Sequence, residues 1–256
     1  MHQVTEIRGI YTLWLREIKR YLRDRARIIS SFVQPLLWLL IFGSGIRFSG
    51  TTIGNLTYQQ YIFPGIIGQT LLFTSMFMGI SVIWDREFGF LKEILVAPIS
   101  RFSVFLGKML GDSTDAVIQG IIVFALGVLL GIPLNPLTFL EALPVMILMT
   151  FGLVGIGLTV ASFIESLESF GVIQSFINLP LFFLSGALFP IRGDVANWLQ
   201  IASSFNPLTY GVDALRTIIL GNAWQPLHPM YFNLLVVCCF DVVMMAIGTY
   251  AFSRRK

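Results

Sequence analysis

The chain has 256 residues, of which 55% are hydrophobic and only 12% are charged, with a net charge of +3. About a quarter of the residues of a soluble domain are charged, so this chain has too few charges to cover a surface that faces water. The composition excludes an ordinary soluble enzyme and predicts an all-α membrane protein.

The first predicted element is an amphipathic helix at residues 5–26. Apolar side chains recur there at helical spacing, and basic side chains cover the rest of the helix. Trp14 and Tyr21 would lie at the level of the lipid headgroups, so we expect the helix to lie in the cytoplasmic interface. The alternative is a positively charged anchor that only fixes topology. The same charges argue against a cleavable signal peptide.

Six membrane-spanning helices are predicted from stretches with few or no charges. A hydrocarbon layer about 30 Å thick requires about 20 apolar residues in a helix. The period-2 alternation of a transmembrane barrel is absent. The predicted spans are residues 28–47, 60–84, 105–130, 140–164, 170–190 and 230–252.

The third and last predicted spans contain spaced glycines or charged residues that call for an explanation. Two glycine pairs have a spacing of four residues, which allows close helix contact: Gly107 and Gly111 at the start of the third span, and Gly127 and Gly131 at its end. Lys108 and Asp112 could pair along the same helix. The last span contains Asp241, and a charge inside lipid usually has a partner or a task. Pairing with another helix or protonation is one interpretation, and a proton or ion role is the alternative.

Basic residues cluster before the first span, between spans two and three, and after the last span. Because Lys and Arg prefer the cytoplasmic ends of spans, both termini are predicted to be cytoplasmic. An even number of spans follows from the same asymmetry.

Residues 85–101, between spans two and three, mix charged and apolar side chains. The apolar residues between Phe90 and Leu95 recur at helical spacing. We expect a short cytoplasmic helix that docks onto another protein, and docking against the chain's own spans is the alternative. Three acidic residues are interpreted as the solvated part of this loop rather than as acid–base groups: Asp85, Glu87 and Glu93.

The segment 191–229, between spans five and six, is hydrophobic in its middle but is interrupted by Asn206-Pro207 and Gly211. We expect short helices that lie at, or dip into, the outer leaflet. A seventh span is the alternative, and it would break the asymmetry of the basic residues.

Several kinds of chemistry have no signature in this sequence. There is no phosphate-binding G-x-x-x-x-G-K-[ST] motif. The two histidines, His2 and His228, are far apart, and no catalytic set of Ser, His and Asp is visible. No catalytic or metal-binding residue is therefore predicted. A membrane enzyme acting on lipids would need such a cluster, and a purely structural scaffold would leave the 85–101 loop unexplained.

Two stretches carry a family resemblance. DREFGFLKEILVAPISR (85–101) resembles the cytoplasmic loop of the type-2 ABC exporter permeases, and SGALFPI (185–191), followed by WLQIASSFNPLTYGVDALR (198–216), resembles their signature after the fifth span. The second stretch is the more specific one. Its signature residues are Gly186, Pro190, Asn206, Pro207, Tyr210, Asp213 and Arg216.

The resemblance implies a permease subunit that pairs with a second permease copy, either identical or related. Each copy would bind a separate ABC ATPase subunit, which would hold ATP and Mg, so no cofactor is expected on this chain and no nucleic acid as partner. The 85–101 loop would be the coupling element. The residues assigned to coupling are Arg86, Glu87, Phe88, Gly89, Lys92, Glu93, Leu95, Pro98 and Arg101.

The resemblance also places a substrate path at the dimer interface, along spans one, two and five. The residues assigned to this path are Gln34, Gln69, Phe73, Phe77, Gln174 and Asn178. On the residues alone, the polar members could equally well form hydrogen bonds between helices. The chain is most similar to the drug and antibiotic exporter branch, which implies export of a hydrophobic or amphipathic cargo across a prokaryotic cytoplasmic membrane. A permease for a lipid-linked polysaccharide is the alternative.

Overall fold

The computed structural model describes residues 2–41, 56–90, 96, 98–129, 131–132, 134–192 and 195–254. All regular elements in this part of the chain are helices, which confirms the all-α prediction there. They are α1 (His2–Arg23), α2 (Arg25–Leu40), α3 (Tyr58–Phe77), α4 (Ile80–Glu87), α6 (Arg101–Leu129), α7 (Pro136–Phe163), α8 (Leu167–Phe183), α9 (Asn197–Ser204), α10 (Pro207–Leu220), the 3-10 turn η2 (Gly221–Ala223) and α11 (Met230–Arg254).

Four helical segments of the described chain are long and apolar enough to cross a membrane, and α8 is apolar but shorter. The four are Tyr58–Glu87, which comprises α3 and α4, Arg101–Val128, Pro136–Phe163 and Met230–Ser253. The predicted first span coincides with α2 as far as Leu40, and its residues 42–47 lie outside the described residues. The predicted 191–229 segment contains α9, α10 and η2.

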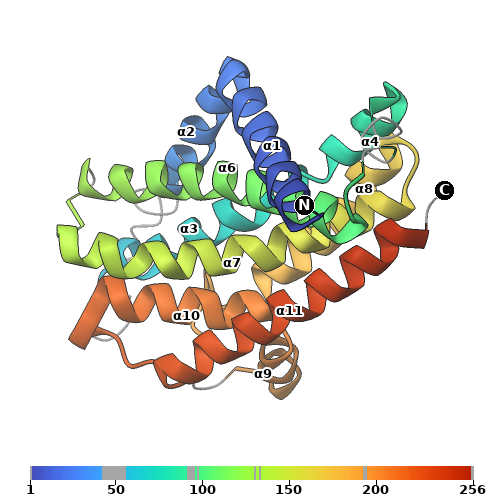
Figure 1. Ribbon diagram of the computed structural model, residues 1–256. Coiled ribbons are helices and arrows are strands. Elements are labelled where there is room, and N and C mark those ends of the chain that lie inside the picture. Colours follow the sequence, from blue (N-terminus) through green and yellow to red (C-terminus); the bar gives the residue numbers. More distant parts are fainter. Residues whose placement is uncertain are drawn as a thin grey trace.

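The helices form a bundle around α3. Helices α6, α7, α10 and α11 lie side by side, with α1 crossing α6 (Figure 1). Helix α3 contacts α6, α7, α8 and α10. In an apolar stretch of 18 residues within the α3–α4 segment, 83% of the stretch is buried, against 17% in the corresponding stretch of α11. Helix α3 is therefore central, and α11 presents most of its surface to the surroundings.

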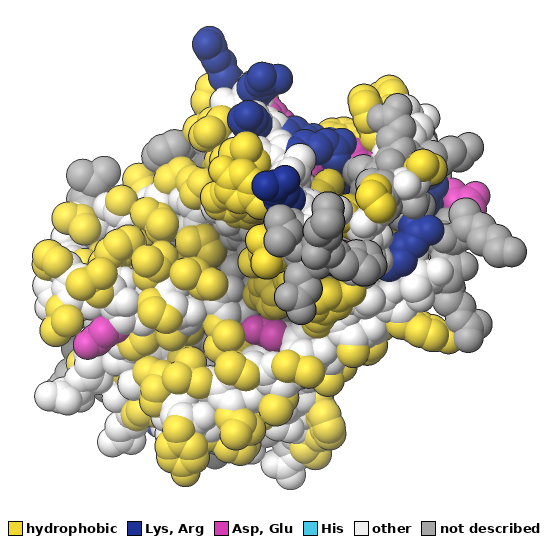
Figure 2. All heavy atoms as spheres, viewed as in Figure 1, with side chains coloured by type: hydrophobic (Ala, Val, Ile, Leu, Met, Phe, Trp, Pro, Cys, Tyr) yellow, Lys and Arg dark blue, Asp and Glu magenta, His cyan; other side chains and the backbone are white. Residues whose placement is uncertain are grey.

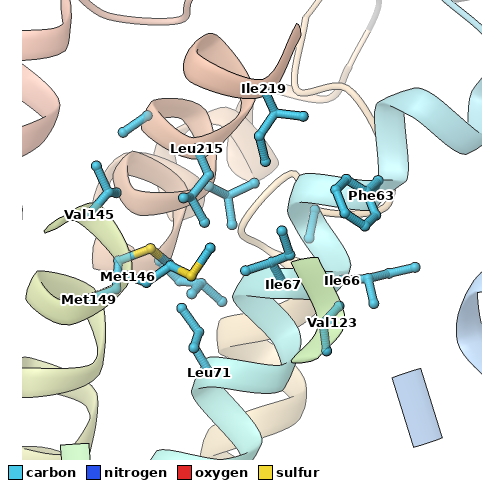
Figure 3. Close-up of a cluster of buried hydrophobic side chains, with 14 of the residues drawn as sticks. Phe63, Ile66, Ile67, Leu71, Val123, Val145, Met146, Met149, Leu215 and Ile219 are labelled. Atoms are coloured by element: carbon cyan, nitrogen blue, oxygen red, sulfur yellow. The ribbon is translucent and has the colours of Figure 1, made fainter. Parts of the chain in front are cut away.

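The main core joins α3 to three neighbouring helices. Figure 3 shows its side chains converging from α3, α6, α7 and α10. Those labelled are Phe63, Ile66, Ile67 and Leu71 from α3, Val123 from α6, Val145, Met146 and Met149 from α7, and Leu215 and Ile219 from α10.

A second apolar cluster connects α1 and α4 to the same bundle. Leu13 of α1 and Val82 of α4 pack with buried side chains of α6, α7, α8 and α11, among them Phe105, Leu158 and Phe252. Helices α4 and α6, which flank the predicted 85–101 loop, are therefore held by this second cluster.

The surface is mainly apolar. Figure 2 shows hydrophobic side chains spread over α7, α10 and α11, and Lys and Arg side chains gathered over α1. Large hydrophobic side chains are exposed on α8 and α11, including Val172, Phe176 and Val242. Exposed apolar surface of this extent indicates a lipid environment, which agrees with the predicted membrane protein.

We expect Leu71→Ala to destabilise the bundle, because Leu71 is 0% exposed in the main core. Leu→Ala substitutions in packed cores cost about 2 kcal/mol or more, since a cavity remains. Thermal unfolding of the detergent-purified protein would show a lower midpoint. Leu137→Ala removes the same atoms from a side chain that is 62% exposed, so it should leave the midpoint nearly unchanged. Equal midpoints for the two variants would contradict the described core.

Candidate functional site

Four charged side chains from three helices meet at the end of the bundle formed by α1, α4 and the start of α6. They are Arg16, Glu17, Asp85 and Lys108, and we call them the buried charge cluster. The Lys108 side chain is fully buried. Its Nζ donates to Asp85 Oδ2 at 2.6 Å and to Glu17 Oε1 at 3.2 Å. A buried ammonium group is tolerated only when it is paired in this way.

Asp85 is held from two sides. The Arg16 guanidinium donates to both carboxylate oxygens of Asp85, with Nη1 3.1 Å from Oδ2. This hydrogen bonding raises the pKa of the Arg16 guanidinium above its ordinary value. The prediction that Asp85 belongs to the solvated part of the loop is wrong, because Asp85 lies in α4 and is buried by these partners. Glu87 is exposed, and Glu93 lies outside the described residues.

Helix α1 lies close enough to α6 for this pairing because two glycines of α6 face it. A Cβ at Gly107 would lie 2.9 Å from a side-chain atom of Leu13, and a Cβ at Gly111 would lie 2.6 Å from one of Glu17. Both distances are too short for non-bonded carbon atoms. The glycine spacing seen in the sequence thus serves the packing of α1 on α6.

Arg86 attaches α4 to α7. Its guanidinium donates to the carbonyl oxygens of Ile164 at 2.8 Å and Ala161 at 3.3 Å. These carbonyls lie at the C-terminal end of α7, where a positive charge also complements the helix dipole. Of the residues assigned to coupling, Arg86 thus contacts the chain's own bundle.

Helix α4 ends in a turn that exposes aromatic side chains. Gly89 has a φ of +80°, the left-handed conformation that favours glycine after a helix. Its N–H donates to the Arg86 carbonyl oxygen at 3.1 Å. Phe88, immediately before this glycine, is 72% exposed, and Phe90 is exposed as well. The sequence EFG therefore ends the helix and presents a phenylalanine.

The remaining coupling residues follow this turn. Val96 is 84% exposed, Pro98 is exposed, and Arg101 is half-buried at the start of α6. Lys92, Glu93 and Leu95 lie outside the described residues. In the described part of this segment, large apolar side chains are therefore exposed, together with the acidic Glu87.

Three of the six residues assigned to the substrate path lie around one small cavity. Gln34 of α2, with Gln69 and Phe73 of α3, lines a cavity of about 20 Å³, which has room for about one water molecule. The sequence interpretation missed other polar members of its wall. Thr70, Thr74 and Gln119 also line it, and the Thr74 hydroxyl donates to Gln119 Oε1 at 2.8 Å.

The other three assigned path residues lie elsewhere. Phe77 lies nearer the buried charge cluster, beside Trp84 and Asp112. Gln174 and Asn178 lie on α8, where Gln174 is half-buried and Asn178 is buried. The structure therefore does not bring all six together within one chain.

Asp213, a signature residue, ties α10 to the segment that leads into α11. Its carboxylate accepts hydrogen bonds from Trp224 Nε1 at 3.0 Å, from the backbone N–H groups of Leu227 and His228, and from Asn233 Nδ2 at 2.9 Å. A buried carboxylate with this many donors is well satisfied. Its partners Trp224 and Asn233 were not identified from the sequence.

Arg216 ties α10 to α3 and to the turn after α8. It is buried and donates to the carbonyl oxygens of Tyr61 at 3.3 Å and Gly186 at 3.1 Å. Its guanidinium carbon lies 4.0 Å from the centroid of the Tyr61 ring and 4.9 Å from that of Trp224, which adds cation–π attraction. Gly186 thus contributes an acceptor to the signature.

The other signature residues shape the start of α10. Asn206 caps the helix, accepting from the Leu208 N–H at 3.0 Å and donating to the Leu181 carbonyl at 2.7 Å. Pro207 occupies the first turn, where its missing N–H is not needed. The Tyr210 hydroxyl donates to the Ser204 carbonyl at 2.7 Å. Pro190 is half-buried after the α8 turn. These contacts position α10 within the bundle. Among the described residues, no group of His, Cys, Asp and Glu is suited to a metal ion.

Known proteins similar to this chain include transport permeases. Residues 8–220 match the family described as ABC-2 type transporter. "Putative transport permease ycf38" of Cyanophora paradoxa is 32% identical, covering 93% of this chain and 86% of the relative. "Nodulation protein J" of Rhizobium leguminosarum bv. viciae is 25% identical, covering 90% and 88%. "Probable multidrug ABC transporter permease YbhR" of Escherichia coli (strain K12) is 27% identical, but only 54% of its length is covered, against 79% of this chain.

We expect Lys108→Met to destabilise the protein by about 3 kcal/mol or more, because it removes a buried partner of Glu17 and Asp85. Adding Glu17→Gln should recover part of the loss, since one uncompensated carboxylate is then removed. Unfolding midpoints in detergent measure both effects. Lys19→Met, at an exposed position of α1, is the matched control and should change little. A Lys108→Met midpoint equal to that of the control would refute the pairing.

Proposed function

The chain belongs to the ABC-2 type transporter family, and from this membership we propose that it is the membrane-spanning permease subunit of an ATP-driven exporter. The chain has apolar helices of spanning length but no phosphate-binding motif of the G-x-x-x-x-G-K-[ST] type. ATP and Mg would therefore be bound by a separate ABC ATPase subunit. This chain would contribute the path and the contact surface, without a catalytic residue of its own.

The observation that carries this proposal is the exposed apolar surface after α4. Phe88, Phe90 and Val96 expose large hydrophobic side chains within a segment that also carries charges. Such a group on a surface that faces water marks a protein interaction site. We assign it to the ATPase subunit. Lys92, Glu93 and Leu95 belong to the same proposed contact on the basis of the sequence pattern.

The contacts around this surface offer a route for force. Asp85 connects α4 to Lys108 of α6 and Arg16 of α1, and Arg86 connects α4 to the end of α7. Movement of the ATPase subunit against Phe88 would therefore be transmitted to three helices at once. Nucleotide shifts the permease between inward- and outward-open states only if the ATPase–permease complex binds it more tightly in one of them.

In the proposed topology, six spans cross the cytoplasmic membrane of a prokaryote. They correspond to α2, the α3–α4 segment, α6, α7, α8 and α11, with α9 and α10 on the outer side. Helix α1 would lie in the cytoplasmic interface, where its exposed Ile7, Tyr11 and Leu22 can contact lipid while Leu13 packs against α6. The buried charge cluster and Phe88 are then cytoplasmic, as an ATPase partner requires.

The proposed functional unit contains two permease copies, identical or related. Helices α2 and α8 expose apolar side chains, among them Val33, Leu37, Phe176 and Leu179, which a second copy would cover. Gln34 and Gln174 would then contribute to a path shared by two copies. A path that combines these amides with the exposed apolar side chains of α2 and α8 suits a hydrophobic or amphipathic cargo, and the similarity to YbhR, named a probable multidrug permease, supports a drug-like one. A lipid-linked polysaccharide is the alternative cargo.

Phe88→Asp should reduce co-purification with the co-expressed ATPase subunit at least tenfold, because a carboxylate replaces the more exposed of the two phenylalanines described between α4 and α6. The unfolding midpoint of the permease should not change, since Phe88 is 72% exposed. Affinity purification through a tag on the ATPase measures the first effect.

Phe205→Asp is the matched control. Phe205 is 84% exposed but lies between α9 and α10, on the proposed outer side, so this variant should co-purify like wild type. Undiminished co-purification of Phe88→Asp would refute the assigned docking surface.

A further inference from the structure

A groove runs along α11 on the surface of the bundle. It is lined by Phe102 of α6, Phe151 of α7 and a row of α11 side chains, and its volume is about 560 Å³. This volume lies within the range of small-molecule binding sites. The α11 residues that line it are Asp241, Val242, Met245, Ala246, Thr249, Tyr250 and Ser253. None of the six residues assigned to the substrate path lines this groove.

Asp241 is the charged residue of this wall. It is 6% exposed, no described side chain donates to its Oδ1, and its carboxylate interacts with the backbone N–H of Gly152. Gly152 of α7 lies against it, where a Cβ would overlap the carboxylate. No basic side chain of the described chain forms an ion pair with Asp241. A carboxylate in a membrane-spanning helix is costly without such a partner.

Thr249 adds a second unpartnered polar atom to the same wall. Its Oγ1 is buried and has no hydrogen bond in the described structure. Other helical threonines, such as Thr70 and Thr159, donate to the carbonyl oxygen four residues earlier. Asp241 and Thr249 are eight residues apart, which corresponds to about 12 Å along a helix. Apolar side chains occupy the positions between them in the groove.

We propose that this groove binds a lipophilic amine in its protonated, ammonium form, which enters from the membrane. The ammonium group donates to the Asp241 carboxylate and supplies the missing positive charge. Its hydrocarbon part lies along Met245, Ala246 and Phe151. A buried ion pair is favourable when further hydrogen bonds satisfy its members, and the N–H groups of an amine provide them.

The charge of Asp241 favours a small cation over a second copy of this chain. The Lys and Arg residues that lie deep in the described bundle are already engaged, since Lys108 is held by two carboxylates and Arg216 by backbone carbonyls. A second copy could therefore cover the groove, but neither its Lys108 nor its Arg216 could pair with the Asp241 carboxylate. The proposed site does not depend on the transport role, because it requires only the folded chain in lipid.

Binding of radiolabelled dodecylamine to the chain in phosphatidylcholine nanodiscs tests this site. Empty nanodiscs provide the background, and dodecanol, which has the same chain and no charge, is the competitor. We expect one saturable site per chain that excess dodecanol does not displace. Non-saturable uptake equal to that of empty nanodiscs would overturn the proposal, as would equal competition by dodecanol.

Substitutions locate the binding. Asp241→Asn should weaken it at least tenfold, and Asp241→Glu should retain it within about threefold. Ala246→Trp leaves the carboxylate in place and fills the groove from an exposed position of α11, so it should also abolish binding without unfolding the protein. Val243→Asn places a polar group on α11 outside the groove and should bind like wild type. Wild-type affinity in both Asp241→Asn and Ala246→Trp would overturn the site.

Discussion

The fully buried ammonium group of Lys108 requires carboxylate partners, and meeting this requirement brings three separate segments together. Glu17 comes from the N-terminal helix and Asp85 from the end of the α3–α4 segment. Asp85 in turn binds Arg16, so each charge in the cluster has an opposite neighbour. Gly107 and Gly111 on the same face of α6 allow α1 the close approach that this pairing needs. Helix α1 is thus part of the bundle, although its composition suggests a helix that only rests on lipid.

The same cluster gives the end of α4 a firm support. Asp85 and Arg86 are adjacent in sequence and bind in different directions, to α1 and α6 and to the C-terminal end of α7. Three residues later, Gly89 turns the chain and leaves Phe88 exposed. An exposed aromatic side chain on a firmly held helix end suits the proposed transmission of force from an ATPase subunit. At the other end of the bundle, Asp213 and Arg216 join α10 to α3 and to the segment before α11, so movement of α3 would reach α10 as well.

Local sequence properties predict where the helices lie better than they predict which side chains contact one another between helices. Apolar length with few charges places α7 and α11 within a few residues, because lipid imposes the same length requirement on every span. Asp85 was misinterpreted because its neighbours in sequence are charged, whereas its partners Lys108 and Arg16 are 23 and 69 residues away. No periodicity reveals such pairing. The signature residues were recognised by resemblance, but their physical roles, such as the donors around Asp213, depend on residues as distant as Asn233. The glycine spacing is a partial exception, because Gly107 and Gly111 do face α1 closely, whereas a Cβ at Gly131, which belongs to a pair of the same spacing, would lie in open space.

In the proposed exporter, energy for transport reaches these helices from a separate ATPase subunit. The most direct measurement is efflux of a lipophilic fluorescent drug from vesicles that contain the permease with or without its ATPase partner, in the presence and absence of ATP and Mg. We expect transport only when the partner and nucleotide are both present, and we expect vanadate to inhibit it. Transport that persists without nucleotide, or that follows an imposed proton gradient instead, would contradict this proposal.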